Sequence, residues 1–117
     1  MITALGFAGC AAAGALARWW FATRRHRRWH DHLPLPTLLV NVTGAFALGC
    51  LVGADVAAPI ATVLGTGFLG AYTTFSTFTR EAHALHTAGD RRSALIYVAL
   101  SVTAGVAAAL AGLALTS

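Results

Sequence analysis

The run GTGFLGAYTTFSTFTRE at residues 65–81 joins an apolar segment to residues that weaken a helix. Gly65, Gly67 and Gly70 are followed by a cluster of threonine and serine residues. Glycine adds backbone freedom, and serine and threonine hydroxyls compete for backbone hydrogen bonds. At membrane depth a break is tolerated only where the freed groups line a cavity or bind an ion. The run therefore predicts a broken helix, with an unbroken helix that packs through a glycine and threonine face as the alternative.

The composition around this run is that of a membrane protein. Of the 117 residues, 57% are hydrophobic and 10% are charged, whereas a soluble domain has about a quarter charged residues. We expect one all-helical domain, residues 1–117, with lipid as its main solvent. Each of four apolar runs has close to the roughly 20 residues that a membrane-spanning helix needs. They cover residues 2–22, 35–56, 59–78 and 94–115.

The first apolar run is not expected to be a cleaved signal peptide. It has no basic segment in front of it, its charges follow it, and three more apolar runs come later. Glycine and alanine recur in all four runs. Small residues let helix backbones approach closely inside a membrane, so the pattern predicts a tightly packed bundle.

The basic residues predict the orientation of the chain. All eight are arginines, and they lie mostly at residues 24–28 and 80–92, between apolar runs. This distribution is typical of loops between membrane helices rather than of a nucleic-acid-binding surface. By the positive-inside rule, the first and third loops are expected in the cytoplasm and both termini outside a plasma membrane.

Polar side chains within the apolar runs are candidates for function, because they are costly in lipid. They are Arg18, Thr37, Asn41, Tyr97 and Ser101. Amides and hydroxyls supply hydrogen-bond donors. The four acids lie in loops or near the ends of the apolar runs, whereas a proton-coupled cation exporter needs a membrane-embedded acid. The chemistry suits a small anion.

Phe75 and Phe78 lie three residues apart in the glycine and threonine run. Aromatic side chains at helical spacing most often fill space against the core or lipid. An aromatic ring also carries a positive edge, which can face an anion without binding it tightly.

Three segments together resemble the Fluc (CrcB) fluoride channel family. They are GALARWW at residues 14–20, TLLVNVTGAFALG at 37–49 and GFLGAYTTFSTFTRE at 67–81. The resemblance extends over essentially the whole chain. It implies an antiparallel dimer of four-helix subunits, with the third helix broken and two fluoride pores along the subunit interface.

The resemblance also implies roles for individual residues. Asn41 matches the pore asparagine, and Phe75 and Phe78 match the phenylalanines whose ring edges contact fluoride. Tyr97 and Ser101 resemble the start of a polar track on the fourth helix.

The remaining matches lie at the first, second and third helices. Arg18 matches an arginine near a pore vestibule, and Thr37 matches a threonine of the second helix. Gly70 and Thr73 match the positions whose backbone carbonyls bind a structural sodium ion that is not transported. Ala71 and Pro36 depart from the family pattern, which commonly has glycine at both positions.

The function implied is passive export of fluoride from the cytoplasm, which reduces fluoride toxicity. The strong charge bias leads to the hypothesis that the subunit inserts mainly one way and pairs with an oppositely oriented relative, with a homodimer as the alternative. A small multidrug exporter is the competing function, but that class needs a glutamate in its first helix, where this chain has Arg18. A non-transporting membrane assembly factor would leave the polar motifs unexplained, and no constellation indicates an enzyme.

Several other reactive residues are expected to have lesser roles. Cys10 and Cys50 lie inside apolar runs and are interpreted as small packing residues. Glu81 is expected to end a helix and to pair with a neighbouring arginine. The histidines are interpreted as part of solvated basic loops rather than of a zinc site. These loop residues are His26, His30, Asp31, His32, His83 and His86.

Overall fold

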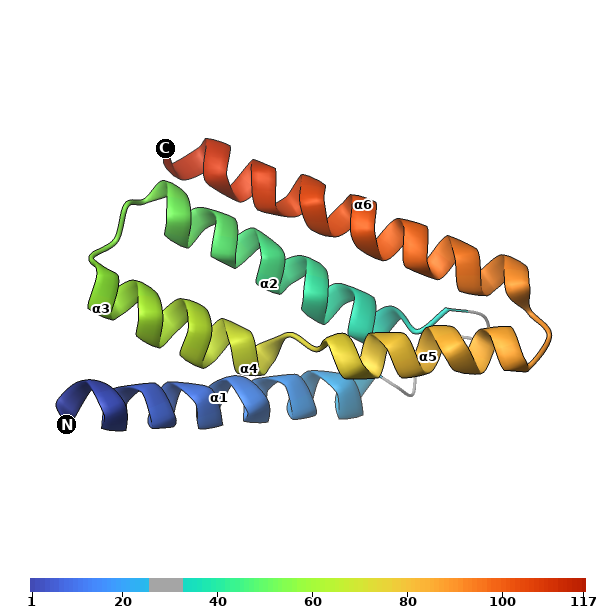
Figure 1. Ribbon diagram of the computed structural model, residues 1–117, viewed down its shortest axis with the longest axis horizontal. Coiled ribbons are helices and arrows are strands. Elements are labelled where there is room, and N and C mark those ends of the chain that lie inside the picture. The colour runs from blue at the N-terminus through green and yellow to red at the C-terminus, as the bar shows by residue number, and fades with distance from the viewer. Residues whose placement is uncertain (26–32) are drawn as a thin grey trace.

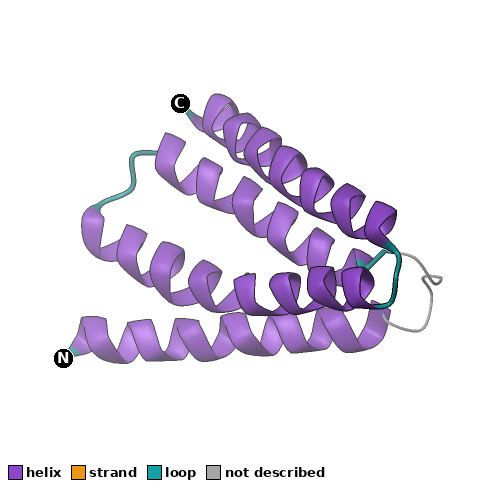
Figure 2. Ribbon diagram, turned by 45° about the vertical axis from the view of Figure 1, so that its right-hand side comes forward, coloured by secondary structure: helices purple, strands orange, loops and turns teal. Residues whose placement is uncertain are grey.

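The computed structural model describes residues 1–25 and 33–117, and the regular elements in these residues are all helices (Figure 2). The all-helical prediction is confirmed for this part of the chain. The elements are α1 (Ile2–Arg25), α2 (Leu35–Gly53), α3 (Ala58–Ala61), the π-helix η1 (Thr62–Leu69), α4 (Gly70–Tyr72), α5 (Phe75–Thr87) and α6 (Arg91–Thr116). The loop that contains His26, His30, Asp31 and His32 lies outside the described residues.

The helices lie side by side in one elongated bundle (Figure 1). The elements α3, η1, α4 and α5 follow one another along a single direction, with α1 alongside η1 and α4. Helix α2 packs along α6. By length and composition α2 and α6 are each able to cross a membrane. The number and limits of the spans stay a prediction.

Glycines in α2 and α6 set the distance between these two helices. A Cβ at Gly49 would overlap the backbone carbonyl of Ala109, and a Cβ at Gly112 would overlap the carbonyl of Phe46. Small residues allow such backbone approach where lipid supplies no hydrophobic force between helices. The α2–α6 pair is therefore held by close packing of backbones.

Glycines also bring the segment from η1 to Thr73 close to α1 and α2. A Cβ at Gly14 in α1 would overlap the carbonyl of Phe68 in η1. A Cβ at Gly44 in α2 would overlap the methyl group of Thr73. Residues 73 and 74 are thus enclosed between α1 and α2.

Two side chains fix where the last two helices begin. The Thr74 hydroxyl accepts a hydrogen bond from the backbone N–H of Thr77, 3.2 Å away, at the start of α5. Asp90 caps α6 through the N–H of Ser93 at 3.0 Å. Such caps satisfy backbone donors that have no partner within the first turn of a helix.

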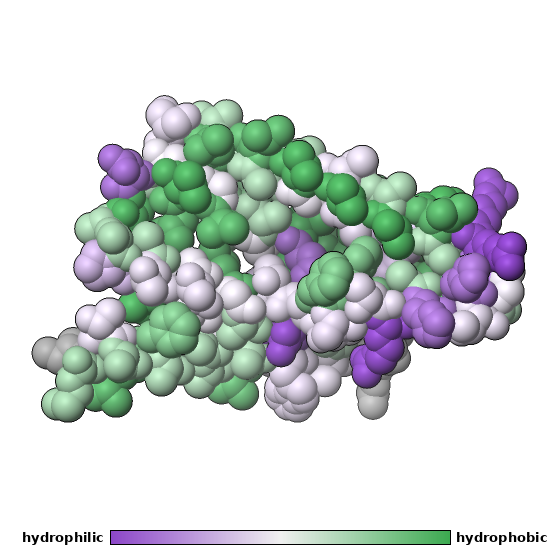
Figure 3. Space-filling model, viewed as in Figure 1, coloured by the Kyte–Doolittle hydropathy of each residue, from purple (hydrophilic) through white to green (hydrophobic). Residues whose placement is uncertain are grey.

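The face of the molecule that Figure 3 shows is apolar along much of its length. Leu16 is 65% exposed, Leu95 72% and Leu110 59%. Few large side chains are buried in the single chain, among them Val40 and Tyr97. Large exposed apolar areas indicate contact with lipid or with another subunit.

Replacing Gly112 with alanine is expected to destabilise the fold by about 1–3 kcal/mol, because the added methyl group meets backbone atoms that cannot rotate away. Thermal unfolding in detergent micelles measures the effect. The matched control is Gly105→Ala in the same helix, where a Cβ meets nothing within 4 Å. Equal unfolding temperatures for the two variants would contradict the packing described for α2 and α6.

Candidate functional site

The chain is extended at two residues between α4 and α5. Thr73 has φ −77° and ψ 163°, and Thr74 has φ −149° and ψ 124°. Helix α4 ends at Tyr72 and α5 begins at Phe75. The backbone groups of an extended pair cannot be satisfied by the helix ladder, so other groups must satisfy them.

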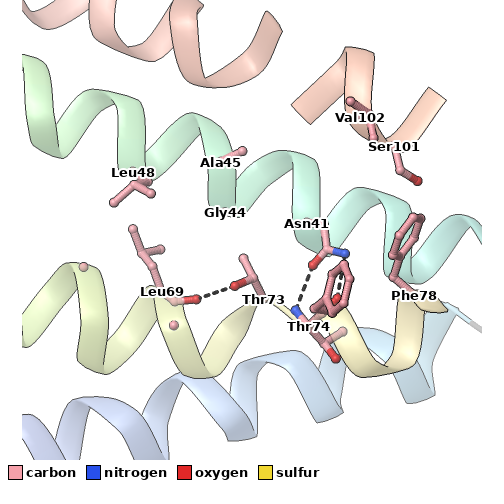
Figure 4. A pocket seen from close by; sticks show the side chains of 13 residues that line it. Asn41, Gly44, Ala45, Leu48, Leu69, Thr73, Thr74, Phe78, Ser101 and Val102 are labelled. Atoms are coloured by element: carbon pink, nitrogen blue, oxygen red, sulfur yellow. Dashed lines mark hydrogen bonds between the residues drawn. The ribbon is translucent and has the colours of Figure 1, made fainter. Parts of the chain in front are cut away.

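Asn41 from α2 pairs with the backbone of Thr74 (Figure 4). Its side-chain nitrogen Nδ2 donates to the Thr74 carbonyl at 2.9 Å, and its Oδ1 accepts from the Thr74 N–H at 2.8 Å. The amide side chain therefore acts toward Thr74 as a neighbouring peptide group would in a sheet. One N–H of Asn41 is left to donate elsewhere.

Arg18 from α1 holds the other extended residue. Its Nη1 donates to the Thr73 carbonyl at 3.0 Å. The Thr73 N–H donates to the Leu69 carbonyl at 2.9 Å. With the two bonds from Asn41, all four backbone polar groups of Thr73 and Thr74 are satisfied.

The glycine contacts explain why these two side chains reach the extended pair. Arg18 follows Gly14 by four residues, and Asn41 precedes Gly44 by three. Residues three or four apart lie on the same face of a helix. Because Gly14 and Gly44 both contact the segment from η1 to Thr73, Arg18 and Asn41 are directed toward it from α1 and α2.

The extended pair also redirects two helical hydrogen bonds. In an unbroken helix the Thr74 N–H would donate to the carbonyl of Gly70, and the Thr77 N–H to that of Thr73. Here they donate to Asn41 Oδ1 and Thr74 Oγ1. The carbonyls of Gly70 and Thr73 thereby lose their usual helical donors.

These two carbonyls are the ones that the resemblance assigns to sodium. Gly70 and Thr73 both line a single cavity beside the extended pair. Thr73 accepts one bond from Arg18, and a carbonyl oxygen has a second lone pair. Backbone oxygens are suitable ligands for a hard cation, so Gly70 and Thr73 fit a sodium ion on chemical grounds.

A cavity of about 450 Å³ opens beside the extended pair. Asn41, Phe78 and Ser101 line it from α2, α5 and α6 (Figure 4). The hydroxyl oxygen of Ser101 is buried and has no hydrogen-bond partner in the described residues. A buried hydroxyl of this kind is available to a ligand.

The aromatic side chains of α5 line this cavity and lie between it and Tyr97 in α6. The ring centroids of Phe75 and Phe78 are 6.0 Å apart, and Phe78 lies 5.3 Å from the Tyr97 ring. Phe75 is 77% exposed in the single chain. The rings thus form a series from the exposed face of α5 toward α6.

Glu81 lies next to Tyr97, the last ring of this series. Thr37 Oγ1 donates to its Oε1 at 3.0 Å, and the Tyr97 hydroxyl donates to its Oε2 at 2.9 Å. The expectation that Glu81 ends a helix and pairs with a neighbouring arginine is wrong. It lies within α5, and hydroxyl groups from α2 and α6 bind both of its carboxylate oxygens.

The structure therefore divides the polar residues into two groups. Arg18 and Asn41 hold the extended pair, and Thr37 and Tyr97 hold Glu81. The Ser101 hydroxyl belongs to neither group. It has no hydrogen-bond partner among the described residues and can donate to a ligand. Their role toward fluoride stays a prediction.

Sequence analysis missed Thr74 and Glu81 as organising residues. A signal existed for Thr74, because threonine is a common residue at the start of a helix. Its side chain accepts a hydrogen bond from the backbone N–H two or three residues later. For Glu81 the signal was weak, because its partners lie 44 and 16 residues away in the chain.

The remaining candidates for metal binding or reactivity are the cysteines and histidines. Cys10 and Cys50 are free. His83 and His86 are exposed on α5. In the described residues no group of three or more histidine, cysteine or acidic side chains is placed to hold a metal ion.

Comparison with known proteins identifies relatives of this chain. Residues 5–113 match the family model described as "CrcB-like protein, Camphor Resistance (CrcB)". A protein of Rhodococcus jostii named fluoride-specific ion channel FluC 2 is 40% identical, over 100% of this chain and 97% of its own length. A FluC 2 protein of Moorella thermoacetica is 42% identical, over 86% and 85% of the two chains. A FluC 1 protein of Bacillus cereus is 38% identical, over 87% and 77%. The chain belongs to the CrcB family of fluoride-specific ion channels.

Proposed function

We propose that this chain is one subunit of a channel through which fluoride leaves the cytoplasm passively. The observation that carries the proposal is the extended pair Thr73–Thr74, whose backbone is held by Arg18 and Asn41 beside a cavity. An interruption of this kind in a membrane span is tolerated where it lines a pathway. We take residues 59–78 as a third span that is broken at these two threonines.

The groups along the cavity suit an anion that must bind weakly and leave. The Ser101 hydroxyl and the remaining N–H of Asn41 are donors for fluoride. The edges of Phe75 and Phe78 carry partial positive charge. The Arg18 guanidinium and the N-terminus of α5 add positive potential nearby. Several weak sites in series allow conduction where one strong site would trap the ion.

The functional unit is an antiparallel dimer. The exposed apolar surface and the open cavity of the single chain both leave room for a second subunit. At a two-fold axis, the carbonyls of Gly70 and Thr73 from each subunit would give four oxygens around one structural sodium ion. The ion would hold the two broken helices together and would not be transported.

The partner is an oppositely oriented relative, since the charge bias favours one orientation of this chain. In this arrangement the loops that follow α1 and α5 are cytoplasmic, and both termini are outside. The relatives carry the numbered names FluC 1 and FluC 2, which is consistent with pairs of such proteins. The small multidrug exporter is not favoured, because α1 has no carboxylate and uses Arg18 to hold the extended pair.

Fluoride efflux from liposomes tests the channel function. Liposomes that contain the protein, with its partner if the single chain is inactive, are expected to release fluoride rapidly and to retain chloride, as read by ion-selective electrodes. Phe78→Ile should abolish most of the flux, because it removes the ring edge next to the cavity. Phe46→Ile in α2 is the matched control outside the cavity and should keep the flux. Equal release of chloride, or full flux with Phe78→Ile, would contradict the proposal.

Replacing Asn41 with aspartate tests how the extended pair is held. The new carboxylate oxygen would face the Thr74 carbonyl where an N–H now donates at 2.9 Å. We expect a loss of about 1–3 kcal/mol in the free energy of unfolding together with loss of fluoride flux. Thr103→Ala, which removes a hydroxyl that bonds within α6, should change neither. An Asn41→Asp protein with normal stability and flux would show that the pairing with Thr74 is dispensable.

The orientation of the chain can be mapped with single cysteines. In a background with Cys10 and Cys50 replaced by alanine, a cysteine at exposed Ala88 should react only from the cytoplasmic side. A cysteine at exposed Ala57 should react only from outside. Equal labelling of either position from both sides would contradict a fixed orientation and would favour a homodimer.

A further inference from the structure

Four exposed arginines lie away from the end of the bundle where both termini lie. Arg24 lies in the last turn of α1, Arg80 within α5, and Arg91 and Arg92 at the start of α6. Figure 1 shows that the C-terminal end of α1 and the connection from α5 to α6 both point away from the chain termini. Figure 3 shows hydrophilic residues gathered around that connection. We call Arg24, Arg80, Arg91 and Arg92, together with Trp19 and Trp20, the basic rim.

The tryptophans place the α1 part of the rim at a particular depth. Trp19 is 64% exposed and Trp20 is 51% exposed, although both are large apolar side chains. The Arg24 guanidinium lies 5.1 Å from the centre of the Trp20 ring. Indole rings concentrate at the level of lipid headgroups in membrane proteins. The Trp20–Arg24 pair therefore holds a cation where phosphate groups of lipid lie.

The charge of the rim is only partly balanced by the carboxylates next to it in sequence. Glu81 follows Arg80 and Asp90 precedes Arg91, which gives two carboxylates for the four rim arginines. The Glu81 carboxylate is turned toward the hydroxyls of Thr37 and Tyr97. The whole chain has eight arginines and four acidic residues. The rim thus presents excess positive charge next to apolar helix surface, of which Leu16 in α1 is 65% exposed.

We propose that the basic rim binds the headgroups of acidic phospholipids. A guanidinium can form two parallel hydrogen bonds with a phosphate group, which makes arginine a strong phosphate ligand. Each basic residue near an anionic membrane surface strengthens binding by about fivefold. A lipid suits the site better than a free phosphate ion, because its acyl chains can cover the apolar surface of α1. The inference concerns lipid recognition and goes beyond the movement of fluoride.

Quenching of tryptophan fluorescence by brominated lipids tests the proposal. The chain has three tryptophans, so Trp29→Phe leaves Trp19 and Trp20 as the reporters next to Arg24. The full-length Trp29→Phe protein is reconstituted into vesicles with a varied ratio of phosphatidylglycerol to phosphatidylcholine, one of the two being brominated. The quenching curves give the relative association constant of the two lipids at the rim. We expect phosphatidylglycerol to be favoured by about fivefold or more.

Two matched variants separate charge from packing. In Arg24→Gln/Arg80→Gln the preference for phosphatidylglycerol should fall by at least about fivefold. In Arg24→Lys/Arg80→Lys most of the preference should remain, because the charge is kept. A parent protein without preference, or one whose preference survives in the glutamine variant, would overturn the proposal.

A competition experiment distinguishes lipid from a soluble anion. Inorganic phosphate added at constant ionic strength should leave the lipid preference unchanged. Loss of the preference would mean that the rim binds free phosphate, which would also overturn the proposal. Fluoride efflux measured in the same vesicles is a separate readout, so a failure of lipid recognition would not be confused with a failure of the channel.

Discussion

Backbone polar groups in a membrane must be paired within the protein, and this requirement explains the arrangement around Thr73 and Thr74. An extended pair between two helices exposes amides and carbonyls that lipid cannot satisfy. Asn41 supplies a donor and an acceptor to Thr74, and Arg18 supplies a donor to Thr73. An unpaired buried group costs about 1–3 kcal/mol. The hydrogen bonds from these two side chains offset this cost at the extended pair.

The glycine contacts follow from the same requirement. A side chain can hold the extended pair only if its own helix lies close, and close approach needs residues without a Cβ. Gly14 and Gly44 provide it on α1 and α2, one turn from Arg18 and Asn41. The cavity lies on the side of the extended pair that α2, α5 and α6 border. The position of the candidate site is thus a consequence of how the interruption is stabilised.

Local patterns in the sequence predict the helical fold and the weak point in residues 65–81, because glycine and threonine act on the backbone where they stand. The family resemblance adds predicted roles for Asn41, Phe75 and Phe78, which the residue pattern already marks as candidates. The sequence does not show what each polar side chain contacts. Proximity in sequence predicts that Glu81 pairs with a neighbouring arginine, yet consecutive residues on a helix do not face each other. Its partners, Thr37 and Tyr97, are brought to it by the packing of three helices.

Solid-state NMR of the protein in lipid bilayers tests the pairing of Asn41 with Thr74 most directly. Asn41 is the only asparagine in the chain, and glutamine is absent, so a ¹⁵N label on side-chain amides reports one position. The account predicts a measurable dipolar coupling between this nitrogen and the ¹³C-labelled carbonyl carbon of Thr74, because Nδ2 and the carbonyl oxygen are 2.9 Å apart. The coupling should disappear in Thr74→Ser when only threonine is labelled. Absence of the coupling in the parent protein would show that Asn41 does not hold the extended pair, and would contradict the account.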